Sequence, residues 1–88
     1  MKEQVFNSYV SKVVKKLQIT KKEFFTNTKK RQVVDARHIV FYLCYKRDIR
    51  MTYIQDYMSR NGYDIPHSVV HYGVRQMGKK VSSDSDYE

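Results

Sequence analysis

Apolar residues recur every three or four positions along most of this chain, the spacing that gathers them on one face of an α-helix. The pattern predicts a first helix over residues 3–18, with an apolar face made of Phe6, Val10, Val13, Val14 and Leu17. Lys12, Lys15 and Lys16 fall on the opposite side, which faces solvent. The most apolar segment follows at residues 31–46. We expect it to form the central helix, with core residues Val33, Val34, Val40, Phe41, Leu43 and Cys44.

Two shorter helices are predicted from capping residues and helix breakers. Thr20 and Glu23 stand at capping-box spacing, which predicts a short helix over residues 20–25 that Phe24 and Phe25 anchor to the core. Thr52 and Gln55 repeat this spacing at the start of a fourth helix. That helix turns Ile54 and Met58 inward and ends at Asn61-Gly62.

A last helix is predicted over residues 65–79, with Pro66 in its first turn and an apolar face made of Val69, Val70, Val74 and Met77. With the fourth helix it forms a helix, a turn and a second helix. This is the layout of a helix-turn-helix, which presents the start of its second helix to the major groove of DNA. We therefore expect an all-α domain, a compact bundle of four to five helices over residues 1–80, followed by a disordered acidic tail at residues 81–88.

The chain is basic, with 17 Lys and Arg against 9 Asp and Glu and a formal charge of +8. Three of those acids, Asp84, Asp86 and Glu88, lie in the last eight residues, so the remainder is more basic still. Such a balance favours a polyanionic partner, either a nucleic acid or an anionic lipid surface. The alternative is a solvated surface that serves solubility alone.

No apolar stretch approaches the roughly 20 residues that cross a bilayer, and no signal peptide is recognisable. We expect a cytoplasmic protein with no membrane partner. Cys44 is the single cysteine, so it forms no internal disulfide and is expected to be a small buried side chain.

The sequence offers little for catalysis. It contains no glycine-rich phosphate loop. His38, His67 and His71 with one cysteine do not make a structural zinc site. Cys44 and His38 are six residues apart on a helix and face different directions, so they do not form a nucleophile pair. We expect neither an enzyme nor a cofactor.

The candidate DNA contacts are basic or hydrogen-bonding residues outside the predicted core. Lys29, Lys30 and Arg31 form either a cationic finger that enters a minor groove or a solvated loop. Arg37 is a phosphate ligand or a snorkelling surface arginine. Lys46, at the end of the central helix, is a further candidate. His67 and Ser68 stand at the tip of the last helix with His71 one turn on, and Tyr63 is a candidate stacking side chain in the turn.

Two segments together resemble the C-terminal DNA-binding domain of the bacterial replication initiator DnaA. They are "TKKRQVVDARHIVFYL", residues 28–43, and "PHSVVHYGVRQM", residues 66–77. In that family an "SKKR"-like loop leads into a helix "hxxxRQhAMYL", and a helix-turn-helix closes on "RDHSTVxHAhxKI". The residues in register are Arg37 and His38 at the "RQ" position, then His67, Ser68, Val70 and Arg75. The resemblance covers about residues 10–78.

The resemblance implies a helical fold of the Trp repressor and DnaA C-terminal type that reads a short site in double-stranded DNA. The basic loop would enter the minor groove, with Lys29 nearest the family's inserted arginine. Arg37, together with Tyr45 or Lys46, would touch phosphate. His67 and Ser68 would reach bases, and Thr52 would offer its helix N-terminus to a phosphate.

The sequence departs from the family at the reading helix. Pro66 replaces the family's aspartate, Val69 replaces a hydroxyl residue, and the turn "SRNGYDIP" is about four residues longer. We therefore expect a target other than the standard DnaA box. Without a counterpart of the initiator's ATPase module, the chain would act as a small phage-type regulator. It would mark an origin, occupy a promoter, or meet a host or phage replication protein.

Two alternatives remain open from the sequence. One is an interaction or virion-associated module that keeps the fold and binds nucleic acid without sequence preference, or binds an acidic protein. The other is a protein that binds structured RNA, which shares the charge but lacks an RNA-binding motif.

Overall fold

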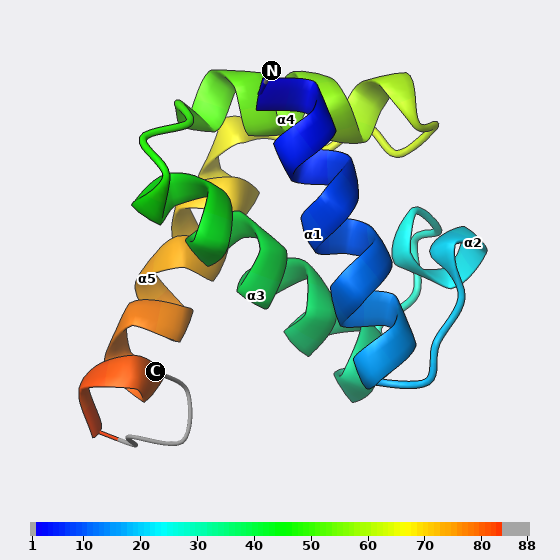
Figure 1. Cartoon of the computed structure of the whole chain (residues 1–88), viewed down its shortest axis with the longest axis horizontal. Helices are drawn as coiled ribbons and strands as arrows, with labels where there is room; N and C mark the ends of the chain where they lie inside the picture. The colour runs from blue at the N-terminus through cyan, green and yellow to red at the C-terminus, as the bar shows by residue number, and fades with distance from the viewer. Residues whose placement is uncertain (1, 84–88) are drawn as a thin grey trace.

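The computed structural model describes residues 2–83, and this part of the chain is all-helical (Figure 1). The five helices are α1 (Lys2–Lys16), α2 (Lys21–Phe24), α3 (Arg31–Lys46), α4 (Met51–Arg60) and α5 (His67–Ser83). The predicted all-α fold is confirmed, and α3 begins and ends at the predicted residues. No helix within residues 2–83 has the length and apolarity needed to span a membrane.

Helix α3 is the centre of the fold, because it contacts all four other helices. Phe41, Val40 and Cys44 are fully buried on it, and they meet Phe6 of α1 and Val70 of α5 within one apolar core. Figure 1 shows α1 and α5 crossing α3 from different sides. The sequence therefore identified the central helix correctly.

Residues in the left-handed conformation follow α1, α3 and α4. Gln18 has a φ of 59° and Asp48 a φ of 62°, and the residues after them, Ile19 and Ile49, donate back to Val14 and Cys44. Gly62, with a φ of 94°, follows the end of α4, which stops at Arg60 just before Asn61-Gly62 as predicted. Aspartate tolerates this conformation better than most residues because its short polar side chain bonds locally.

The capping box at α2 is confirmed. The Glu23 N–H donates to Thr20 Oγ1 at 3.0 Å, and the Thr20 N–H donates to the Glu23 carboxylate at 3.1 Å. The second predicted box is wrong. Arg50 is the N-cap residue of α4 and makes no side-chain cap, while Gln55 donates instead to the Ile65 carbonyl at 2.9 Å. Gln55 thus fastens the turn before α5 rather than the start of its own helix.

The last helix differs from its prediction at both ends. It begins after Pro66 and continues to Ser83, so Val81 and the two serines after it are helical rather than part of a disordered tail. Val81 lies four residues after Met77 and shares a groove with it beside α1 and α3, which extends the apolar face. Residues 84–88 of the predicted tail lie outside the described residues.

Val69 is another correction. It is 39% exposed, whereas Val70, Val74 and Met77 are buried as predicted. The true buried face runs through Gly73 instead. A glycine there lets α5 approach α3, because a Cβ at that position would lie 2.8 Å from His38 Cδ2 and 2.9 Å from Phe41 Cδ2.

We predict opposite effects for alanine at the two glycines of α5. Gly73→Ala is expected to lower the free energy of unfolding by about 1–2 kcal/mol, because the overpacking cost exceeds the helix-propensity gain. At Gly78 the contact of the added Cβ with the described side chains would be with Tyr42 Cε1 at 3.8 Å, an ordinary distance. Gly78→Ala should therefore raise the free energy of unfolding by up to about 1 kcal/mol. Urea titrations of both variants measure the change in the free energy of unfolding. A change in the same direction for both variants would contradict the packing described.

Candidate nucleic-acid interface

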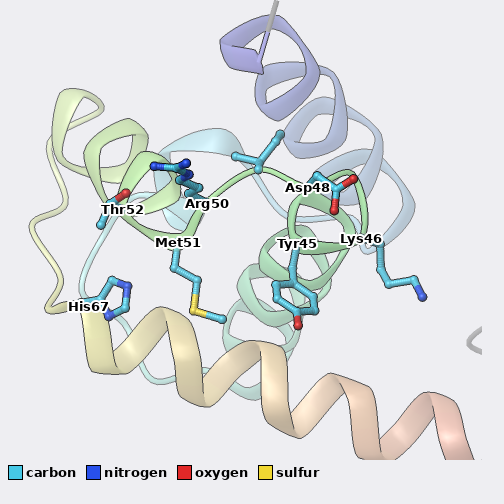
Figure 2. A pocket seen from close by; sticks show the side chains of 8 residues that line it. Tyr45, Lys46, Asp48, Arg50, Met51, Thr52 and His67 are labelled. Atoms are coloured by element: carbon cyan, nitrogen blue, oxygen red, sulfur yellow. The ribbon is translucent and has the colours of Figure 1, made fainter.

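A hollow of about 660 Å³ opens where the end of α3, the start of α4 and the start of α5 meet (Figure 2). The residues that line it are Tyr45, Lys46, Asp48, Ile49, Arg50, Met51, Thr52 and His67. Three of the predicted contacts, Lys46, Thr52 and His67, therefore come together from three different helices. Figure 2 shows Tyr45 and Met51 pointing toward α5, with His67 at its start.

The rim of the hollow is mainly cationic. Lys46 and Arg50 are exposed, and Figure 2 shows Lys46 extending away from the ribbon, whereas Asp48 contributes one carboxylate. Helix α4 begins here, so the N–H groups of Met51 and Thr52, two residues that line the hollow, lack intrahelical acceptors. Two exposed cations beside a helix N-terminus are suited to a phosphate group.

The start of α5 is solvent-exposed, as the sequence predicts. His67, Ser68 and His71 are all exposed, and so are Val69 and Tyr72 on neighbouring positions. The His71 Nε2 atom lies 3.1 Å from an Arg75 guanidinium nitrogen, one turn farther on. The tip therefore offers hydrogen-bonding groups and two apolar side chains to any surface that approaches it.

The basic connection, residues 26–30, carries its cations at the surface together with Arg31. Lys29 is exposed, Lys30 lies 3.8 Å from the Glu23 carboxylate, and Arg31 lies 3.9 Å from Asp35. The Lys30 and Arg31 side chains are 74% and 87% exposed, so solvent and salt weaken these pairs. All three cations remain accessible to a polyanion.

Arg37 corrects the sequence-based assignment, because it is neither a surface arginine nor placed to hold a phosphate. The residue is only 6% exposed. Its guanidinium donates to the carbonyls of Phe24 at 2.8 Å and Thr28 at 3.1 Å, and also to those of Thr26 and Glu23. Burial lowers its pKa, against the opposing influence of Tyr63. Arg37 therefore binds the main chain of the basic connection from within.

Tyr63 also has a different place from the stacking role assigned to it. The residue is half-buried, and its ring lies over Arg37 with 4.7 Å between the guanidinium carbon and the ring centroid. Its hydroxyl donates to Asn27 Oδ1 at 3.4 Å. One face of the ring is thus occupied by Arg37, so Tyr63 joins the turn before α5 to the basic connection.

Sequence reasoning missed several residues of this region. Met51 lines the hollow, and Asn27 accepts from the turn, yet each reads singly as an ordinary helix or surface residue. Ile49 and Ile65 are buried in the connections on either side of α4. An isolated apolar residue between two polar runs is the only signal that would have indicated them.

His38 lies between α3 and α5, with its ring edge-to-face against Tyr72 and the centroids 5.9 Å apart. Burial is the main cause that lowers its pKa; Asp35 opposes the shift, while Lys80 and Arg37 add to it. Cys44 is fully buried, as predicted, and burial raises the pKa of its thiol to about 12. The thiol is therefore neutral and unreactive at physiological pH.

We predict that the lowered pKa of His38 makes the fold less stable in mild acid. The unfolded chain takes up its proton near the ordinary pKa of about 6.5, while the folded protein resists protonation. Stability from this group is complete above that pH and is lost as the pH falls below it. The melting temperature should fall between pH 7.5 and 5.5, and a His38→Gln variant should show a smaller fall. An equal fall in both proteins would exclude His38 as the cause.

Comparison of the chain with protein-family models, curated proteins and solved structures gave no match. We therefore infer function from the residues and geometry of this chain alone.

Proposed function

We propose that this protein binds double-stranded DNA in a sequence-specific manner, in replication initiation or transcription regulation. In this proposal α4, the turn after it and α5 act as a helix-turn-helix. The tip of α5 enters the major groove, where His67 and Ser68 meet base edges. The basic connection follows the backbone into an adjacent minor groove.

The observation that carries the proposal is the meeting of three helix ends at the hollow. The exposed tip of α5, the N-terminus of α4 and the cations Lys46 and Arg50 lie together there. Phosphate contacts position a protein on a duplex, and contacts from a helix tip read its bases. The hollow supplies both kinds of group beside each other.

The experiment is a selection of bound duplexes from a random DNA pool at about 50 and 200 mM salt, a range over which phosphate-dominated binding weakens steeply. We expect one enriched motif at both salt concentrations, with lower recovery at the higher one. A His67→Ala and Ser68→Ala variant should change the preferred bases, because each good base contact is worth about 1–3 kcal/mol. Identical motifs for the variant and the wild type would remove these two residues from base reading.

A second candidate function is binding of nucleic acid without sequence preference, as an interaction or virion-associated module. Pro66 favours it, because a proline directly before α5 leaves no acceptor side chain at that point of the tip. In the selection experiment this candidate predicts binding that is lost with salt and yields no enriched motif. Recovery of a motif would exclude it.

A further inference from the structure

The buried guanidinium of Arg37 fixes the shape of the basic connection. It donates to main-chain carbonyls at residues 23, 24, 26 and 28, which span the end of α2 and the first part of the connection. Hydrogen bonds to a charged donor are among the stronger ones in proteins, and those of Arg37 are largely shielded from water. Carbonyls that would otherwise point in separate directions thus converge on one side chain.

The ring of Tyr63 covers the same guanidinium from the other side. Tyr63 belongs to the turn between α4 and α5, 36 residues beyond its hydroxyl partner Asn27. The turn is fastened at two further points, since the Tyr63 N–H donates to the Met58 carbonyl at 3.0 Å and Gln55 holds Ile65. Arg37 therefore stands between two segments that are distant in sequence.

We propose that Arg37 and Tyr63 form a joint that positions the basic connection relative to the tip of α5, so that both regions meet DNA as one rigid unit. Arg37 and Tyr63 are positioning residues in this proposal, and neither touches DNA. The consequence for DNA binding rests on the proposed function. The joint itself rests on contacts within the protein and is testable without DNA.

The physical effect is preorganisation. A connection held in place loses little conformational freedom when Lys29 meets a phosphate, whereas a freed connection must be ordered on binding. Releasing the joint should therefore reduce what Lys29 contributes to affinity, although Lys29 itself is unchanged. A side chain that simply stacked on a base would not alter the contribution of Lys29.

The first test measures the joint without DNA, by hydrogen exchange of backbone amides. The Thr28 N–H donates to the Thr26 carbonyl at 2.7 Å, and the Lys30 N–H donates to Thr28 Oγ1 at 3.3 Å, so both report the shape of the connection. A Tyr63→Leu variant should exchange both amides at least about tenfold faster, while core amides of α3 stay protected. Tyr63→Phe keeps the ring over Arg37 and should exchange like the wild type.

The second test is a double-mutant cycle on DNA affinity, measured with a duplex that the wild type binds. Lys29→Ala should weaken binding about fivefold in the wild type at 0.15 M salt, as the loss of one phosphate contact predicts. In the Tyr63→Leu background the same change should weaken binding less than twofold. If Tyr63→Leu fails to fold, Arg37→Lys replaces it, since lysine keeps the charge but lacks the planar fork.

The outcomes are separable. Unchanged exchange of the Thr28 and Lys30 amides in a folded Tyr63→Leu variant would overturn the joint. If Lys29→Ala weakens binding equally in both backgrounds, the joint does not position the basic connection for DNA. If the wild type binds no DNA, the proposed function fails, and the exchange experiment alone decides whether the joint exists.

Discussion

Replacing Lys29, Lys46 and Arg50 together with alanine is expected to weaken binding to duplex DNA about 100-fold at 0.15 M salt. Each side chain is exposed and stands in one of the two cationic regions, the basic connection or the rim of the hollow. Each lost phosphate contact removes about 0.9 from the slope of log K against log salt, so the three changes should flatten that slope by nearly three. Fluorescence anisotropy at several salt concentrations measures both quantities.

The matched control removes the same number of charges from another surface. Lys12, Lys15 and Lys16 are also exposed, but they lie on α1. Their triple alanine variant has the same net charge as the first and should lose less than about tenfold in affinity, through long-range attraction alone. Equal losses in the two variants would show that the protein attracts DNA by overall charge and not through the hollow and the connection.

Arg37→Met is expected to lower the free energy of unfolding by about 2–4 kcal/mol, because several partly buried carbonyls lose a charged donor at once. For a domain of this size that corresponds to a melting temperature roughly 10–30 °C lower. The methionine can fill part of the space left by the arginine stem, so the loss of the hydrogen bonds should account for most of the effect. Differential scanning calorimetry measures it.

Arg31→Met is the control for that prediction. It also removes one arginine charge from α3, but the Arg31 side chain is 87% exposed and makes a long ion pair with Asp35. Its effect on the free energy of unfolding should stay within about 0.5 kcal/mol. If Arg37→Met lowers the free energy of unfolding by less than about 1 kcal/mol, water replaces the guanidinium as hydrogen-bond donor to these carbonyls at little cost.

The helices were predictable because long segments with apolar residues at helical spacing leave few alternatives. The bounds of α3 and the burial of Phe6, Val10, Phe41 and Met58 follow from that spacing. Val69 was assigned wrongly because the stripe around it is broad, and only the close contact at Gly73 decides which side of α5 faces α3. Periodicity locates a helix more reliably than it fixes its rotation.

The candidate site was predictable only in part, since its parts lie far apart in sequence. Lys46, Thr52 and His67 could be named singly, but their meeting depends on how three helices end. Arg37 shows the limit most clearly. An arginine one turn into an apolar helix indicates a surface position, and only the folded connection provides the carbonyls that make its burial favourable.

The hydrogen bonds of Arg37 also bear on how readily this chain can change over evolutionary time. They end on main-chain oxygens, which every amino acid supplies, so Arg37 itself places little demand on the side chains at residues 26 and 28. Lys29 between them is exposed, so a mutation at this position can exchange charge or size while the path of the backbone is retained. A segment of this kind can acquire a new target without a new scaffold.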